Sequence, residues 1–219
     1  MSIEANLHKI KSAIPKDVTL VAVSKTKPVN DLMQAYNAGQ RIFGENKIQE
    51  MTEKWEQMPK DIEWHMIGHV QRNKVKYMAA YVTLIHGVDS LKLLKEINRQ
   101  AAKNNRTINC LLQIHIAEEE TKFGMDENEL ISLLNSDEYH QLQNIKISGL
   151  MGMATFTNDM EQIKKEFSFL KSLFDKLKTR HPDFSILSMG MSSDFPLAIE
   201  CGSTMVRIGS SIFGKRNYA

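Results

Sequence analysis

Short apolar runs alternate along the chain with stretches in which apolar residues recur every three or four positions. Eight of these runs are rich in apolar and β-branched residues and have polar or glycine positions at their ends, as buried strands do. The eight runs are residues 18–24, 41–45, 63–69, 82–89, 109–117, 146–154, 184–190 and 204–210. Such continuous apolar strands favour parallel pairing in a sheet that is covered on both faces.

The stretches between the runs have the period of amphipathic helices. After the first run, Val29, Leu32, Met33 and Tyr36 share one face, and Gly39 ends the helix. Further helices are expected over residues 48–58, 90–101, 126–134 (with a capping box of Asp126 and Glu129), 159–179 and 193–202 (capped by Ser193), and an additional N-terminal helix over about residues 2–13.

Eight strand–helix units in one chain predict a (β/α)₈ barrel, the TIM-barrel fold, as a single α/β domain over residues 1–219. No linker or break in composition divides the chain. A doubly wound open sheet is the alternative, and the absence of a G-x-G-x-x-G motif after the first strand argues against it.

Charge and cysteine content exclude several classes of protein. The 28 Lys and Arg residues nearly balance the 26 Asp and Glu residues, so the net charge of +2 gives no general attraction to nucleic acid or to an anionic membrane. Two distant cysteines and scattered histidines disfavour a metal site. The N-terminus is too polar for a signal peptide and no apolar run is long enough for a membrane span, so we expect a cytoplasmic protein.

In such a barrel the functional residues follow the C-terminal ends of the strands. The polar or glycine-rich positions at these ends are Lys25, Glu45, Asn46, His69, Gln71, Asn73, Lys74, Asp89, 118–124, 151–155, 191–193, Arg207, Gly209 and Ser210. A polar ring above an apolar barrel indicates a small-molecule site. The histidines at 69, 86 and 115 are expected to be satisfied core residues.

Lys25 has the parity of Val21 and Val23, so it points inward if these valines face the barrel axis. A partly desolvated lysine has a lowered pKa and is a nucleophile toward carbonyl groups. A solvated lysine at a strand end is the alternative. Lys27 lies beyond the strand and next to Pro28, and we expect it at the rim of the site.

The last two strands offer an anion site. Ser192 and Ser193 follow the seventh strand, and Gly209 and Ser210 follow the eighth, where barrels commonly bind phosphate with backbone N–H groups. Arg207 lies within the eighth strand and carries a permanent charge. It either donates to a ligand or forms a structural salt bridge across the barrel.

The motifs VAVSKTKP, FGENKIQE, WHMIGHVQRNK, SGLMGMA and LSMGMSSDFPLAIECGSTMVRIGSSIFG resemble those of the pyridoxal-phosphate homeostasis proteins. These are single-domain barrels similar to the N-terminal barrel of alanine racemases. The resemblance extends from Val18 to the end of the chain, which stops soon after the eighth strand without a counterpart of the second racemase domain.

The resemblance implies the ligand and the roles of its neighbours. Lys25 matches the lysine that holds pyridoxal phosphate (PLP) as a Schiff base. Ser192, Gly209 and Ser210 match phosphate-binding positions, and Met191 is expected to contribute its backbone.

Two further residues match positions around the cofactor ring. Asn46 matches a residue that lines the ring, and Arg207 matches the arginine that faces the pyridine nitrogen. An arginine cannot accept the proton of that nitrogen, so the ring stays neutral and is a weaker electron sink. The tyrosines, at 36, 77, 81, 139 and 218, do not lie at predicted strand ends, so no replacement for the catalytic tyrosine of racemases is evident.

We therefore expect a PLP-binding protein with little or no turnover, which holds and releases PLP. Its expected partners are PLP itself and apo forms of PLP-dependent enzymes, and a monomer is expected. An amino-acid racemase is the first alternative. A Schiff-base aldolase that uses Lys25 on a sugar phosphate without a cofactor is the second.

Overall fold

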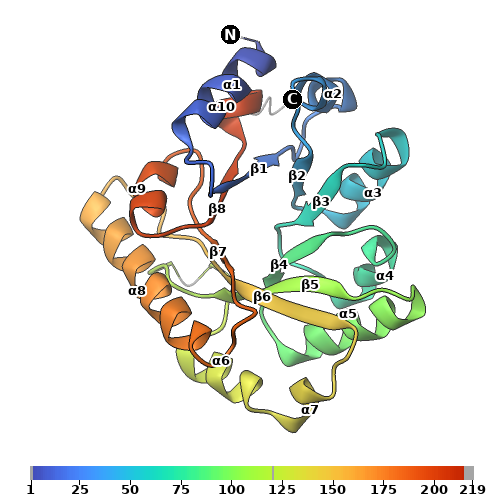
Figure 1. Cartoon of the computed structure of the whole chain (residues 1–219), viewed down its shortest axis with the longest axis vertical. Helices are drawn as coiled ribbons and strands as arrows, with labels where there is room; N and C mark the ends of the chain where they lie inside the picture. Colours follow the sequence, from blue (N-terminus) through green and yellow to red (C-terminus); the bar gives the residue numbers. More distant parts are fainter. Residues whose placement is uncertain (1, 120, 215–219) are drawn as a thin grey trace.

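Eight parallel strands close into a barrel in a computed structural model of the chain, and helices surround it (Figure 1). The structure describes residues 2–119 and 121–214. The strands are β1 Thr19–Val23, β2 Ile42–Glu45, β3 Glu63–Met66, β4 Leu84–Val88, β5 Ile108–Ile114, β6 Ile145–Gly152, β7 Ile186–Ser188 and β8 Met205–Ile208. The helices are α1 Ile3–Ala13, α2 Val29–Asn37, α3 Ile48–Gln57, α4 Val75–Met78, α5 Leu91–Lys103, α6 Glu127–Leu134, α7 Asp137–His140, α8 Met160–Lys178, α9 Phe195–Glu200 and α10 Ser210–Phe213, with a 3₁₀ turn, η1, at Arg72–Lys74. The predicted barrel is confirmed, and the open sheet is excluded.

The barrel closes by parallel pairing of its first and last strands. Thr19 of β1 pairs with Met205 of β8, and Val21 pairs with Arg207. Closure therefore places the strand that leads to Lys25 directly beside the strand that carries Arg207, although 182 positions (207 − 25) separate the two residues in the sequence.

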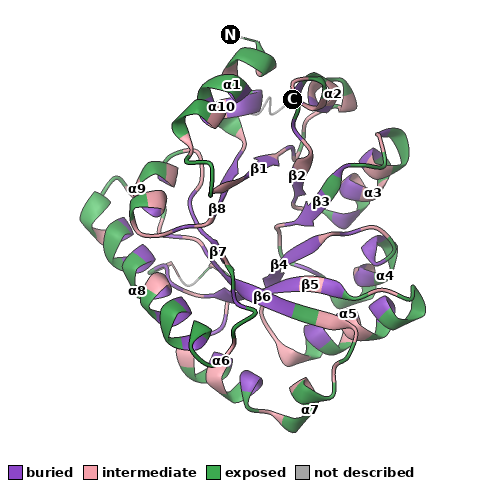
Figure 2. Ribbon diagram, viewed as in Figure 1, coloured by how far each residue is buried: buried purple, intermediate pink, exposed green. Residues whose placement is uncertain are grey.

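Two apolar layers flank the strands, which are buried along most of their length (Figure 2). The inner layer fills the barrel with Val21, Leu84, Leu111, Met151 and Met205. A larger outer layer packs the opposite faces of the strands against the helices. Because Val21 belongs to the inner layer, the odd positions of β1 face the barrel axis, as the prediction for Lys25 requires.

The N-terminal helix packs against α2 and against α10, the last helix of the described residues. The hydroxyl of Ser2 accepts from the N–H of Ala5 and caps α1, and the side chain of Leu7 is fully buried. The Asn6 side chain donates to the carbonyl of Ile212, which joins α1 to α10 beside it (Figure 1). The additional N-terminal helix is thereby confirmed.

Most helix boundaries follow the predicted signals. Asp126 and Glu129 form the expected capping box of α6. The predicted cap of α9 is wrong: Asp194 holds the N-cap position, and Ser193 lies in the turn before it. The sequence pattern missed the short elements η1, α4, α7 and α10. Within the described residues, no helix is both long and apolar enough to cross a membrane.

Candidate functional site

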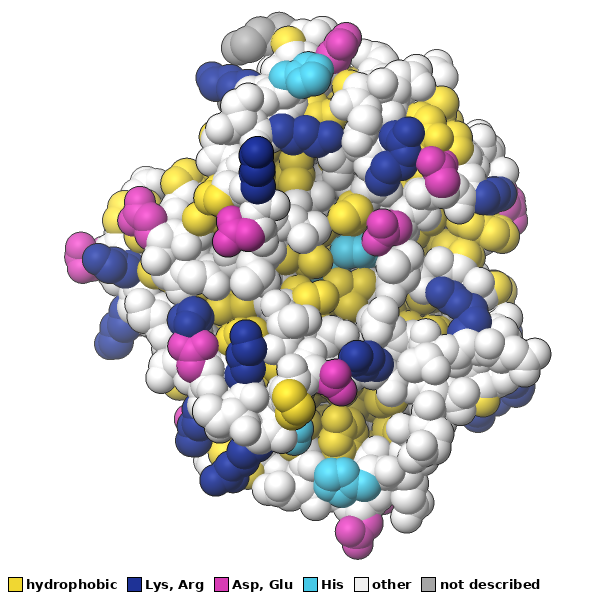
Figure 3. All heavy atoms as spheres, viewed as in Figure 1, with side chains coloured by type: hydrophobic (Ala, Val, Ile, Leu, Met, Phe, Trp, Pro, Cys, Tyr) yellow, Lys and Arg dark blue, Asp and Glu magenta, His cyan; other side chains and the backbone are white. Residues whose placement is uncertain are grey.

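A cavity of about 380 Å³ opens at the C-terminal ends of the strands. All seven predicted site residues line it: Lys25, Asn46, Met191, Ser192, Arg207, Gly209 and Ser210. The remaining lining residues are Val23, Lys27, Ile67, Met153, Phe156, Ser193 and Gly214. Figure 3 views the molecule along the barrel from the opposite end, where the N-terminal ends of the strands lie, and shows hydrophobic side chains at the centre of that face between charged ones.

Lys25 stands in a tight turn that begins immediately after β1. The N–H of Lys27 donates to the carbonyl of Ser24 at 3.1 Å, and Thr26 between them has a φ of 64°. Both lysines line the cavity. The turn thus places two lysines at the wall of one cavity.

The loops after β7 and β8 meet at the cavity wall. The backbone N–H of Gly209 donates to the hydroxyl of Ser192 at 3.2 Å. A Cβ atom on Gly209 would lie 3.0 Å from the carbonyl oxygen of Val23, so glycine allows the end of β8 to approach β1 closely. These loops bring hydroxyl and backbone N–H groups together, which are the groups that bind phosphate.

Met191 lines the cavity, but its backbone N–H is engaged within the protein. It donates to the Asp194 carboxylate at 2.5 Å. Burial raises the pKa of Asp194, and this hydrogen bond opposes the rise. A backbone contribution of Met191 to ligand binding therefore remains a prediction.

Arg207 is held by neutral acceptors inside the barrel and is only 4% exposed. Its Nη1 donates to the Ser188 carbonyl at 2.9 Å and to the Ser188 hydroxyl at 2.6 Å, and its Nη2 donates to the Gly152 carbonyl at 3.0 Å. Its hydrogen bonds thus go to Ser188 and Gly152 and not to a carboxylate, although the charge of Asp194 attracts it. Burial lowers the pKa of Arg207 to about 10 and the charge of Asp194 opposes the fall, so the guanidinium stays charged at neutral pH.

A chain of hydrogen bonds continues from Arg207 through the barrel. His86 Nδ1 lies 3.0 Å from the Ser188 hydroxyl, and His86 Nε2 lies 3.1 Å from His65 Nδ1. A guanidinium only donates, so the Ser188 hydroxyl accepts from Arg207 and is also hydrogen-bonded to His86, which is hydrogen-bonded to His65. Burial lowers the pKa of His65 to about 3 and that of His86 well below its usual value, so both rings are neutral.

The prediction of satisfied core histidines is confirmed for His86 and is wrong for His69. His86 is a satisfied core residue, as expected. His69 is not: it is exposed, lies 3.3 Å from the Asp89 carboxylate and stacks on Phe123. His115 is half-buried and bonds to the carbonyl of Glu119. His69 is exposed because it follows β3 by three residues and lies in a loop.

Glu45 was expected in the polar ring, and the structure places it elsewhere. Its neighbours Gly44 and Asn46 have the inward parity, so the Glu45 side chain lies on the outer face of the barrel wall, against α3. Sequence reasoning also missed Ser188 and His65, although their strand parity could have indicated an inward orientation.

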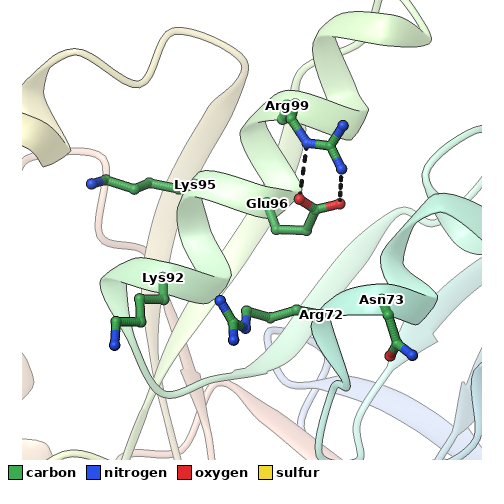
Figure 4. Close-up of a pocket in the computed structure, with 6 residues that line it drawn as sticks. All are labelled: Arg72, Asn73, Lys92, Lys95, Glu96 and Arg99. Carbon is green, nitrogen blue, oxygen red and sulfur yellow. Dashed lines mark hydrogen bonds and ion pairs between the residues drawn. The ribbon is translucent and has the colours of Figure 1, made fainter.

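A second hollow, of about 390 Å³, lies on the outer surface beside η1 and α5. It is lined by Arg72, Asn73, Lys92, Lys95, Glu96 and Arg99, and the guanidinium of Arg99 binds the Glu96 carboxylate with two hydrogen bonds (Figure 4). No strand residue contributes to it, so it is separate from the cavity of the barrel.

Comparison with known proteins gives a consistent result. The family model for the alanine racemase N-terminal domain matches residues 1–217. The pyridoxal phosphate homeostasis protein of Pasteurella multocida is 41% identical over 234 aligned positions, which cover all of both chains. The PipY structure from Synechococcus elongatus with PLP bound has a TM-score of 0.89 and 34% identity, and covers 97% of this chain and all of that chain.

Similarity to full alanine racemases is more distant. The enzyme from Clostridium difficile has a TM-score of 0.81 but only 17% identity, and the match covers 98% of this chain and 60% of the racemase. This likeness concerns the fold alone. The family model and the full-length relatives lead to the same assignment as the strand-end motifs and the closed barrel. The chain therefore belongs to the pyridoxal phosphate homeostasis proteins of the alanine racemase N-terminal domain family.

Proposed function

We propose that this protein binds pyridoxal 5'-phosphate and serves its homeostasis, with little or no catalytic turnover. The observation that carries the proposal is that five residues with suitable groups line one cavity: Lys25 with its amine, Ser192 and Ser210 with their hydroxyls, Gly209 with its backbone, and the buried Arg207. These groups fit a flat ligand that has an aldehyde, a phosphate and a ring nitrogen. The relatives' names and the PLP-bound neighbour support the same ligand.

Lys25 is proposed to hold the cofactor as a Schiff base. Its amine nitrogen adds to the aldehyde carbon, a carbon–nitrogen double bond forms, and the aldehyde oxygen leaves as water. Addition of water reverses the step and returns both the amine and the aldehyde. The bond is covalent yet reversible, which suits storage and release.

Ser192, Gly209 and Ser210 are proposed to bind the phosphate through hydroxyl and backbone N–H groups. Asn46 is proposed to line the ring. When bound, the cofactor supplies an electron sink for carbanions at an amino-acid α-carbon. In this protein, Arg207 and the residues that line the cavity are proposed to limit this carbanion chemistry.

Efficient racemisation needs groups that exchange protons with the substrate, and Arg207 is not such a group. Ser188 and Gly152 hold its guanidinium from within the barrel, and a guanidinium has no acceptor for a proton from a ring nitrogen. Among the described residues that line the cavity there is no tyrosine to exchange protons with a substrate. Tyr218, the last tyrosine of the sequence, lies outside the described residues. Racemase activity is the alternative function.

The proposed partners are PLP and apo forms of PLP-dependent enzymes, which would receive the released cofactor. A cytoplasmic location and a monomeric state remain predictions from the sequence, as does a role for Lys27 in exchange.

The test is transfer of cofactor from the loaded protein to an apo-enzyme while an excess of an aldehyde-trapping amine removes unbound PLP. Recovery of enzyme activity faster than trapped free PLP allows would support the proposal. A parallel assay measures racemisation of alanine and serine. Turnover at about 1 s⁻¹ or faster would contradict the proposed lack of catalysis and favour the racemase alternative.

A further inference from the structure

Two acidic side chains and a lysine form a buried cluster on the outer face of the barrel wall, behind the Lys25 turn. Lys54 of α3 donates from Nζ to Glu45 Oε1 at 2.8 Å and to Glu50 Oε1 at 2.7 Å. Its third hydrogen bond goes to the Ser24 carbonyl at 2.8 Å. Lys54 is only 5% exposed and Glu45 is fully buried. All three N–H groups of this ammonium are therefore satisfied within the protein.

The cluster binds both peptide units that flank Lys25. The Ser24 carbonyl, which precedes Lys25, accepts from Lys54. The Thr26 N–H, which follows Lys25, donates to Glu50 Oε1 at 2.6 Å. The Ser24 hydroxyl adds a third link by donating to Glu45 Oε1 at 2.6 Å. The backbone of Lys25 is thus fixed on both sides by residues outside the cavity.

The backbone held in this way is strained. Thr26 has a φ of 64°, a left-handed conformation that costs a β-branched residue roughly 1–2 kcal/mol. Such conformations persist where surrounding contacts impose them, and they are frequent at functional sites. The links to Ser24 and Thr26 are contacts of this kind.

The cluster is not arranged for stability alone. Glu45 Oε1 receives hydrogen bonds from both Ser24 and Lys54, whereas Glu45 Oε2 is buried and has no hydrogen-bond partner among the described residues. A buried ionic group is weak evidence for a stabilising role, because desolvation offsets much of its attraction. The cluster leaves Glu45 Oε2 without a hydrogen bond but binds the backbone on both sides of Lys25. A role in positioning Lys25 explains this arrangement.

We propose that Lys54, with Glu45 and Glu50, is a positioning residue that sets the backbone of Lys25 and so directs its amine toward the ligand aldehyde. The proposal rests on the proposed function, in which Lys25 bonds to PLP. It predicts that the cluster contributes to binding of the aldehyde and not to binding of the ring and phosphate, which other loops contact.

The test compares two ligands that share the ring and the phosphate. Pyridoxal phosphate has the aldehyde, whereas pyridoxine phosphate has an alcohol that cannot bond covalently to an amine. Lys54→Met is expected to raise the Kd for pyridoxal phosphate by about tenfold or more, and the Kd for pyridoxine phosphate by less than about threefold. Lys164→Met, which removes an exposed lysine from α8, is the control and should change neither Kd.

Circular dichroism shows whether Lys54→Met folds. If it does not, a second variant, Glu50→Gln, provides the test. Glu50→Gln keeps the shape of a half-buried residue and weakens the hydrogen bond to Thr26. It should raise the Kd for pyridoxal phosphate by about threefold and leave pyridoxine phosphate unaffected. Equal weakening of both ligands in the folded variants, or no change in either, would overturn the positioning role. Failure of the unmodified protein to bind either ligand would instead overturn the proposed function.

Discussion

Arg207 Nη1 donates a hydrogen bond of 2.6 Å to the hydroxyl of Ser188, which ties β8 to β7 inside the barrel. This contact starts the chain that continues to His86 and His65. The permanently charged donor fixes the direction of the first hydrogen bond, in which Ser188 accepts from Arg207. Arg207, which lines the cavity, therefore belongs to a buried polar network in which the histidines are neutral.

Ser188→Ala should destabilise the protein by roughly 1–3 kcal/mol, because it deprives Arg207 and His86 of a buried partner. Urea unfolding followed by circular dichroism measures the loss. Ser185→Ala removes an exposed hydroxyl just before the same strand and should change the free energy of unfolding by less than about 0.5 kcal/mol. Equal effects of the two substitutions would show that the network does not contribute to stability.

The buried histidines predict sensitivity to acid. Burial lowers the pKa of His65 to about 3 and that of His86 well below 6.5, whereas in the unfolded chain both titrate at their ordinary value. The unfolded state therefore binds more protons below about pH 6.5, and the free energy of unfolding falls as the pH drops, by up to about 1.4 kcal/mol per unit for each histidine. His86→Gln should lose less stability than the unmodified protein between about pH 7 and pH 5. An unchanged slope would contradict the neutral assignment.

Glu45 gives the free energy of unfolding the opposite pH dependence to that of the histidines. Burial is the largest cause that raises its pKa, from 4.5 to about 7, and Lys54 and Ser24 oppose the rise. The folded state then binds the extra proton, so this contribution to stability is complete below about pH 4.5 and is lost as the pH rises through 7. Relative to the unmodified protein, Glu45→Gln should gain up to about 3 kcal/mol in free energy of unfolding between about pH 5 and pH 8. Parallel pH curves for the two proteins would show that Glu45 is ionised throughout this range.

Gly209→Ala should weaken PLP binding while the barrel remains folded. The new Cβ would lie 3.0 Å from the Val23 carbonyl oxygen and 3.2 Å from Val23 Cβ, so the end of β8 must shift away from β1. The shift also disturbs the hydrogen bond from Gly209 to Ser192. Titration with PLP should give a Kd raised by about threefold or more, because a small displacement of preorganised donors lowers affinity. Unaltered affinity would exclude close packing at Gly209 as a requirement for phosphate binding.

The pattern of apolar positions was sufficient to predict the eight strands and the inward direction of Lys25. Parity along β1 and β8 follows from strand geometry, and barrel closure then places Lys25, Arg207 and the two terminal loops around one cavity. This part of the site could be predicted because each residue is defined by its place on its own strand.

The supporting network could not be predicted in this way. Lys54 lies within an amphipathic helix, and only the packing of α3 on the outer face of the barrel brings it to Ser24 and Glu45. Glu45 adjoins Asn46, yet alternation along β2 places the two side chains on opposite faces of the wall. Such contacts depend on three-dimensional packing between distant elements, which has no local sequence signal.

The most direct test of the central claim is the absorption spectrum of the purified protein and of Lys25→Ala after addition of PLP and removal of unbound ligand. The unmodified protein should show a band at about 420 nm from the Schiff base, and Lys25→Ala should lack it. Lys164→Met, an exposed control, should retain the band. Protein that remains colourless with added PLP, or a Lys25→Ala variant that keeps the full band, would contradict the assignment of Lys25 as the residue that holds the cofactor.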